Sequence, residues 1–171
     1  MKTNFRKMLK FSVLLVSSLL IATASAAYYR YLNIQGFVSV GPGGLIWVKG
    51  VEQAGTVTIS GSTATVSFTL TNGTTNDITG HLYLKNLDNI NHSIVINVTD
   101  AANQTYYTTF EIRIYNNATG ASIAALNALS TSSYYSGTIT ANAVWHITFY
   151  IVTKSDASVT NDTFALQFRY E

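Results

Sequence analysis

Apolar and polar residues alternate strictly along four stretches of this 171-residue chain. In the run from Ala64 to Leu70, the apolar side chains fall on one side of an extended strand and the hydroxyl side chains fall on the other. The same period of two recurs over residues 110–114, 145–151 and 164–170. Because successive side chains of a strand point to opposite faces, the pattern predicts strands with one face on a core and the other in water.

Weaker strand patterns fill the rest of the chain, and clusters of Gly, Pro, Asn and Asp separate them. They cover residues 45–49, 56–60, 79–85, 93–98 and 134–140. About nine strands in one ordinary domain predict an all-β fold, a two-sheet sandwich of the jelly-roll or immunoglobulin-like kind. Only residues 121–129 have a helix-like composition, with Ile123, Leu126 and Leu129 among alanines, so at most one short helix is expected there.

The first 26 residues have the three parts of a secretory leader. Basic residues precede an apolar run over 11–21, which ends near the small residues Ala24-Ser25-Ala26. The apolar run is shorter than the roughly 20 residues that a bilayer-spanning helix needs. We therefore expect an N-terminal signal helix that is cleaved between Ala26 and Ala27, so that the mature protein is secreted and keeps no permanent membrane span.

A second interpretation of the same residues stays open. A type IV pilin is cleaved just before its apolar helix, and the helix then remains on the mature subunit and packs in the filament core. Such a cleavage site usually carries Gly or Ala, whereas this chain has Arg6-Lys7-Met8 and Lys10-Phe11. The sequence therefore favours complete removal of the leader.

Removal of the leader reverses the sign of the net charge. It takes four of the ten basic residues and none of the eight acidic ones, which leaves six against eight and a net charge of −2. The basic pI of about 8.8 therefore reflects the leader. No nucleic-acid partner is expected, because binding would need a clustered Lys/Arg face on the folded domain. The chain has no cysteine, so its stability has to come from packing, strand pairing or contacts with neighbouring subunits.

Six Asn-x-Ser/Thr sequons suggest how a chain with so few charged residues stays soluble. We expect N-linked glycans on several of them, and no other cofactor. The alternative, an Asn/Thr-rich surface in an organism that does not glycosylate, stays open for each site. The candidate acceptors are Asn72, Asn91, Asn97, Asn103, Asn117 and Asn161.

The start of the mature chain is unusually apolar for a terminus. Leu32, Ile34, Val38 and Val40 share one side of an extended segment, interrupted only by Gly36. An apolar terminus of this kind is not expected to stay in water. The turn-rich run 41–44, Gly-Pro-Gly-Gly, follows it and allows the segment either to fold back into its own sheet or to reach a neighbouring subunit.

These features together resemble the camelysin/TasA-like biofilm matrix fibre proteins. The resemblance includes the leader, the apolar N-terminal strand and the Gly-rich break, followed by the runs 65–72 (TVSFTLTN), 82–86 (LYLKN) and 94–98 (IVINV). The Asn/Thr/Tyr-rich, charge-poor mature chain is most similar to their archaeal relatives, the bundling pilins and other donor-strand thread pilins. It covers most of the mature chain and rests on pattern and composition.

The resemblance implies a structural subunit that polymerises outside the cell by donor-strand complementation. Residues 27–40 would be the donor strand and residues 41–171 a β-sandwich pilin domain. The partner would be another copy of the chain in a head-to-tail filament at the cell surface, with lateral bundling of filaments in adhesion and biofilm formation. The implied donor positions are Tyr28, Leu32, Ile34, Gly36, Val38 and Val40.

No constellation for catalysis or metal binding stands out, so the protein is not expected to be an enzyme. His81, His92 and His146 are isolated, without the spacing of a metal-ligand set. The acidic residues are mostly single and lie in turns, and neither a cysteine nucleophile nor a G-x-S-x-G motif is present. No catalytic or metal-binding residue is predicted.

A monomeric secreted module is the alternative function. It would be a carbohydrate-binding or surface-coat β-sandwich, with the N-terminal segment as an ordinary first strand of its own sheet. A carbohydrate-binding module displays an exposed aromatic platform. The tyrosines of this chain are scattered near the starts of the predicted strands, which disfavours that function.

Overall fold

The computed structural model describes residues 31–40, 44–51, 55–157 and 161–171, and within 31–40 it describes the side chains of Gln35 and Gly36 only. The predicted leader, its cleavage site at Ala26 and Ala27, and the donor position Tyr28 lie outside these residues. Residues Tyr31–Glu171 form one compact unit. A search of the described ranges finds no helix with the length and hydropathy needed to cross a membrane.

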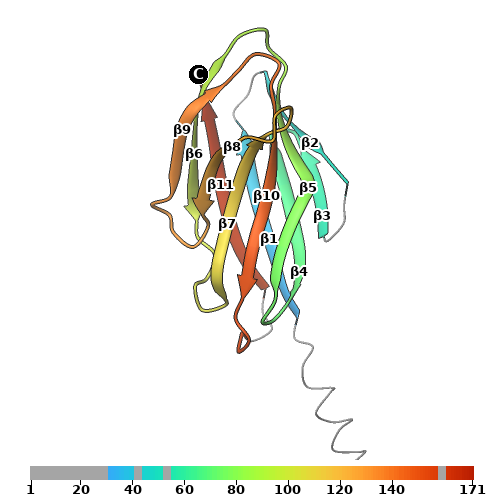
Figure 1. The fold of residues 1–171 in the computed structure, drawn as a ribbon, viewed down its shortest axis with the longest axis vertical. Coiled ribbons are helices and arrows are strands. Elements are labelled where there is room, and N and C mark those ends of the chain that lie inside the picture. The colour runs from blue at the N-terminus through green and yellow to red at the C-terminus, as the bar shows by residue number, and fades with distance from the viewer. Residues whose placement is uncertain (1–30, 41–43, 52–54, 158–160) are drawn as a thin grey trace, which may run out of the picture. The chain divides into compact units, whose positions relative to one another are not determined.

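Eleven strands make up the described part of the chain (Figure 1). They are β1 (Tyr31–Val40), β2 (Leu45–Lys49), β3 (Gly55–Ser60), β4 (Thr63–Thr71), β5 (Thr75–Asn86), β6 (His92–Asp100), β7 (Tyr107–Asn116), β8 (Ser122–Asn127), β9 (Tyr134–Ile139), β10 (Val144–Thr153) and β11 (Asn161–Tyr170). All four strongly alternating stretches are strands. β2 has the predicted bounds, and the other weak candidates are strands with ends shifted by a few residues.

The strands form two sheets that lie face to face, which confirms the predicted all-β sandwich. One sheet has the order β3-β4-β1-β11-β6-β9 and the other has the order β2-β5-β10-β7-β8. In Figure 1, β5, β10 and β7 lie in front of β4, β1 and β11. The strand order, which the sequence leaves open, places the first strand in the interior of the larger sheet.

Aromatic side chains join the two sheets in the core. The Phe68 ring of β4 lies 4.9 Å from the Phe149 ring of β10, and the Phe164 ring of β11 lies 5.0 Å from the Phe110 ring of β7. Trp47 of β2 meets Phe168 of β11 edge-on at 5.0 Å. Edge-on and tilted ring pairs of this kind add about 0.5–1.5 kcal/mol each beyond the area that they bury. The core therefore joins aromatic side chains of both sheets, and β11 contributes two of them.

The helix-like run 121–129 contains strand β8 instead of a helix. β8 pairs with β7, with Leu126 opposite Ile112 and Ala124 opposite Ile114. Of the three residues that a helix would have aligned, only Leu126 is fully buried, and Ile123 and Leu129 are half-buried. Pairing with the free edge of β7 satisfies a row of backbone groups, and this tertiary gain outweighs the helical preference of the alanines.

Candidate functional site: the slot occupied by β1

β1 lies in a slot between two strands that are far from it and from each other in the sequence. On one side it runs antiparallel to β4, from Tyr31 opposite Thr71 to Ser39 opposite Thr63. On the other side it runs parallel to β11, from Asn33 opposite Asn161 to Val40 opposite Phe168. Every other strand pair in the described residues is antiparallel. We call the space between β4 and β11 the β1 slot.

The register places the predicted donor positions opposite core residues. Leu32 is paired with Leu70 and Ile34 with Phe68, and both partners are only 1% exposed. Val38 is paired with Ala64, which is fully buried. Residues that are directly opposite in an antiparallel pair share one face of the sheet. The register therefore places the predicted donor positions 32, 34 and 38 next to buried residues of β4.

Gly36 occupies the one point of the β1 slot where no side chain fits. A Cβ atom at this position would lie 2.1 Å from Cζ of Phe164, far inside van der Waals contact. The Phe164 ring cannot swing away easily, because it is fully buried and packs against Phe110 and Phe149 at centroid distances of 5.0 and 6.0 Å. The glycine that interrupts the apolar face of β1 thus marks the register position that faces Phe164.

The two ends of the sandwich differ, and β1 connects them. At the end that we call the Thr71 end, the turn after β4 meets the segment after β10, with the amide of Gly73 donating to the Lys154 carbonyl at 3.2 Å. At the opposite end, the Asp88 end, the loops 87–91 and 140–143 meet, with the amide of Asn142 donating to the Asp88 carbonyl at 3.1 Å. β1 enters the slot at the Thr71 end and leaves it at the Asp88 end.

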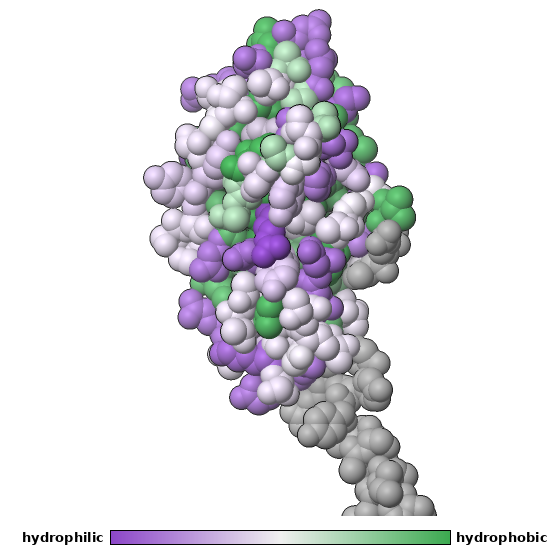
Figure 2. Space-filling model, viewed as in Figure 1, coloured by the Kyte–Doolittle hydropathy of each residue, from purple (hydrophilic) through white to green (hydrophobic). Residues whose placement is uncertain are grey.

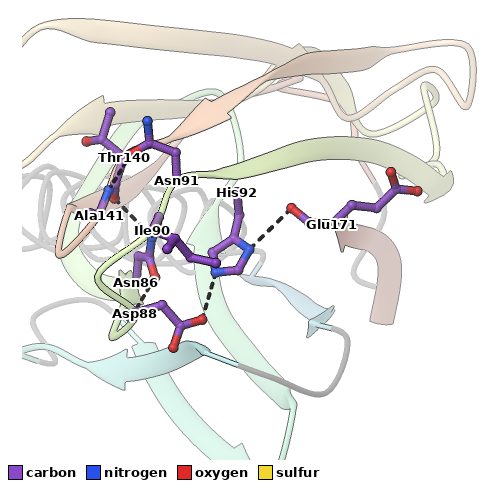
Figure 3. Close-up of polar contacts among 8 residues, drawn as sticks. All are labelled: Asn86, Asp88, Ile90, Asn91, His92, Thr140, Ala141 and Glu171. Carbon is purple, nitrogen blue, oxygen red and sulfur yellow. Dashed lines mark hydrogen bonds and ion pairs between the residues drawn. The ribbon is translucent and has the colours of Figure 1, made fainter.

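A polar cluster lies at the Asp88 end (Figure 3). It contacts Gly44, the residue that precedes β2. The Leu87 amide donates to the Gly44 carbonyl at 2.8 Å, and a Cβ at Gly44 would lie 1.9 Å from Oδ2 of Asp88. The same Asp88 oxygen lies 2.7 Å from Nε2 of His92, and Nδ1 of His92 lies 3.2 Å from the main-chain oxygen of Glu171. Both ring nitrogens of His92 therefore lie within hydrogen-bond distance of an oxygen atom. The cluster ties the start of β2 to the ends of β6 and β11.

Asn86 is the buried centre of this cluster. Its Nδ2 donates to the Ile90 carbonyl at 2.9 Å and to the Thr140 carbonyl at 3.0 Å, and its Oδ1 accepts from the Asp88 amide at 2.9 Å (Figure 3). The side chain is fully buried. Its pairing therefore holds the two loops of the Asp88 end together.

We expect Asn86→Ala to lower the free energy of unfolding by about 2–4 kcal/mol, because it removes three hydrogen bonds of a fully buried side chain and leaves a cavity in its place. Asn89→Ala is the matched control, since Asn89 is exposed and accepts only from Asn142 in the same loop pair. The control is expected to change stability by no more than about 0.5 kcal/mol. Urea unfolding of the two variants measures both effects, and equal effects of the two substitutions would contradict this role of Asn86.

A row of aromatic side chains crosses the outer face of the smaller sheet. This row was not predicted from the sequence. The ring of His146 on β10 stacks on Tyr115 of β7 at 5.0 Å and 14°, and it lies 6.4 Å from Tyr83 of β5. One register step further along, Arg113 lies 4.0 Å above the ring of Tyr150 and pairs with Glu111 at 2.7 Å. The hydrogen bond that Arg113 donates to Glu111 raises the pKa of Arg113. These residues are far apart in the sequence, and only strand pairing brings them together.

Figure 2 shows this face in colours of intermediate and polar hydropathy, with hydrophobic atoms scattered over it. Val48 of β2 extends the aromatic row, because it is paired with Tyr83 and is 37% exposed. His146, predicted to lie on the wet face of its strand, is half-buried under its tyrosine neighbours. Burial lowers the pKa of His146 below its ordinary value.

The lowered pKa of His146 predicts a pH dependence of stability. The folded chain binds a proton at His146 less readily than the unfolded chain, whose histidine titrates near pH 6.5. The stabilising contribution is therefore complete above about pH 6.5 and is lost as the pH falls through the folded-state pKa. We expect the urea midpoint of the unsubstituted protein to fall relative to that of His146→Phe between pH 7.5 and pH 5. A difference between the two proteins that does not change with pH would contradict this prediction.

The sequons differ in accessibility. The exposed acceptors are Asn91, Asn103, Asn117 and Asn161. Asn97 is half-buried within β6. Asn72 is half-buried at the Thr71 end, where its Nδ2 donates to the Ala157 carbonyl and its Oδ1 is buried without a hydrogen-bond partner.

The histidines lie in three separate environments. His81 is fully buried next to the Phe68 ring, His92 belongs to the Asp88 cluster, and His146 lies in the aromatic row. Within the described residues, no group of three His, Cys, Asp or Glu side chains is placed to hold a metal ion.

Comparison with known proteins finds no protein-family model and no curated relative that matches this chain. The β1 slot, the polar cluster and the aromatic row therefore have to be interpreted from their own geometry. Sequence reasoning identified the positions of β1 but missed Phe164 as the partner of Gly36, Asn86 as the buried loop anchor, and the aromatic row. The signal for Phe164 was present in part, because the one small residue in an apolar face requires a bulky neighbour.

Proposed function

We propose that this chain is the structural subunit of an extracellular filament, and that each subunit donates β1 to the β1 slot of the next. The observation that carries the proposal is that β1 fills a slot between β4 and β11. These two strands are far apart in the sequence and run in opposite directions. A strand in that position can be exchanged for the same strand from another copy without changing any pairing inside the rest of the sandwich.

Two features of the chain support exchange over permanent self-insertion. In the sequence, the run 41–44 after Val40 has few side chains to pack, a composition that would suit a change in the direction of the chain. The absence of cysteine means that no disulfide holds β1 in its own subunit, so β1 can leave its slot without the breaking of a covalent bond. Secretion by the predicted leader would deliver the subunit to the cell surface.

Lateral bundling, adhesion and biofilm formation belong to the same proposal. The aromatic row of Tyr83, His146 and Tyr115 is the best placed surface for contact between filaments, since tyrosine rings offer large contact area at low entropic cost. It lies on the sheet that does not contain the β1 slot, so it stays available after polymerisation.

A monomeric surface or carbohydrate-binding module is the second candidate function. Two observations favour it. β1 completes its own sheet in the single chain, and the aromatic row gathers three rings on one outer face, where a sugar could contact them. The two candidates differ in whether the secreted protein is a polymer.

Electron microscopy of material sheared from the cell surface, with N-terminal sequencing of the same sample, tests the proposal. We expect filaments whose subunit begins at Ala27. Discrete monomers that begin at Ala27 would favour the second candidate. Filaments whose subunit retains the apolar run 11–21 would indicate a type IV pilin.

The proposed N-linked glycans give a further prediction. We expect glycopeptide mass spectrometry of the native protein to find glycans at the exposed Asn103 and Asn117, and Asn72 to be unmodified, because its Nδ2 already donates to the Ala157 carbonyl. A glycan on Asn72, together with unmodified Asn103 and Asn117, would contradict the prediction.

A further inference from the structure

Chain connectivity limits how β1 can be donated. Three residues separate Val40 from Gly44, so these two residues stay within about 14 Å of each other. Gly44 is held at the Asp88 end of its own subunit by the hydrogen bond from Leu87 and by its close packing on Asp88. Wherever β1 is inserted, its C-terminal end has to lie close to the Asp88 end of the subunit that donates it.

Insertion in the direction seen in the single chain leads to a closed pair. In that direction Val40 lies opposite Phe168, at the Asp88 end of the acceptor. The Asp88 ends of donor and acceptor would then meet, and the acceptor's own β1 would leave at the same junction. Reciprocal exchange fills both slots within a two-fold pair and leaves nothing to recruit a third subunit.

Insertion in the opposite direction leads to an open chain. Val40 would then lie at the Thr71 end of the acceptor, so the Asp88 end of one subunit would meet the Thr71 end of the next. Each subunit would present a different end to each neighbour. A head-to-tail contact of this kind repeats without closing.

The β1 slot accepts a strand in either direction. β4 and β11 run antiparallel to each other, since β1 is antiparallel to the first and parallel to the second. A strand inserted either way therefore makes one parallel and one antiparallel ladder. The backbone pairing alone gives little preference for either direction.

The alternate residues of β1 are aliphatic on both sides of Gly36. Leu32 and Ile34 precede Gly36 at steps of two, and Val38 and Val40 follow it at the same steps. When the strand is turned about Gly36, the glycine remains at Phe164 and an aliphatic residue remains at each neighbouring position. The close packing of Gly36 on Phe164 therefore does not favour one direction of β1 over the other.

We infer that β1 reverses its direction when the subunit polymerises, so that it runs parallel to β11 in the free subunit and antiparallel to β11 of the neighbour in the filament. The inference rests on the proposed filament function. Reversal explains how the same strand can complete the sheet of the free subunit and also join neighbouring subunits in an open polymer. It also prevents the free subunit from assembling by simple local exchange.

Single cysteines in this cysteine-free chain test the direction. Ser39 is opposite Thr63 in the free subunit, and reversal about Gly36 would bring Ser39 to the place of Asn33, opposite Thr69. Thr63 and Thr69 are about 20 Å apart along β4, and a disulfide needs Cα atoms within about 7 Å. Full-length Ser39→Cys chains are mixed with Thr63→Cys or with Thr69→Cys chains that carry a different mass tag, assembled into filaments and oxidised.

We expect mixed-tag disulfide dimers from the Ser39→Cys and Thr69→Cys mixture, at least tenfold more than from the Ser39→Cys and Thr63→Cys mixture. The free subunit with both Ser39→Cys and Thr63→Cys is the positive control, and it is expected to close an intramolecular disulfide. If Ser39→Cys cross-links to Thr63→Cys in the filaments, or to neither position, the reversal is wrong. The proposed filament function would still hold in that case. Absence of filaments from the unsubstituted chain overturns the proposed function, and the inference with it.

Discussion

Removal of residues 28–40 is expected to leave a subunit that is secreted but barely stable and unable to polymerise. Without β1, the facing edges of β4 and β11 have no partner, and the core side chains beside the slot, among them Phe68, Phe164 and Phe168, lose their cover. A gap in the middle of a sheet removes two ladders and opens the core to water. We expect a loss comparable to the entire free energy of unfolding of a small domain, about 5–15 kcal/mol.

Circular dichroism during thermal unfolding measures this loss, and a synthetic peptide of residues 31–40 is expected to restore the transition in a concentration-dependent way. A peptide with Gly36→Leu is the matched control and is expected to have no effect, because its side chain would overlap the Phe164 ring. Unchanged unfolding of the truncated chain would show that the slot closes by itself, and the donor-strand proposal would then fail.

Substitution of Gly36 by a larger residue is expected to destabilise the packing of β1 in its slot. In Gly36→Val, the new Cβ alone would lie 2.1 Å from Cζ of Phe164, and the buried ring is enclosed by Phe110 and Phe149. Overpacking of a tight core costs about 1–3 kcal/mol, and an overlap this deep is expected to reach the top of that range or to expel β1 from the slot. Gln35→Ala, at the exposed neighbouring position, is expected to change stability by no more than about 0.5 kcal/mol.

A double-mutant cycle separates this steric clash from a general weakening of β1. Phe164→Ala alone removes a buried ring and is expected to cost about 3–5 kcal/mol. Combined with Gly36→Val, it makes room for the new side chain, so the double variant is expected to be more stable than the sum of the two losses predicts. Additive losses in urea unfolding would mean that Gly36 and Phe164 do not depend on each other.

The strands could be predicted because their signal is local. Alternation in 64–70 or 145–151 needs only the period of a strand and one buried face, and both stretches are strands in the larger and smaller sheets respectively. The run 121–129 was ambiguous for the same reason. Its composition favours a helix weakly, and the deciding partner, the edge of β7, is distant from any local window.

The candidate site could be predicted only on the side of β1. The apolar positions and the glycine of 32–40 are visible in the sequence, whereas Phe164 lies more than a hundred residues away and is recognised as their partner only through the parallel pairing with β11. Asn86 and the row of Tyr83, His146 and Tyr115 were missed because their positions in the sequence form no recognisable pattern. Their contacts depend on which strands are neighbours in the sheets.

The sequence by itself determined that this chain is a β-sandwich with an apolar first strand, since alternation, turn residues and the small residue at 36 are properties of neighbours along the chain. Only the tertiary structure decided where that strand lies, which strands flank it and in which direction it runs. Strand order depends on contacts between residues far apart, and the antiparallel flanks of the β1 slot make both directions nearly equal in backbone pairing.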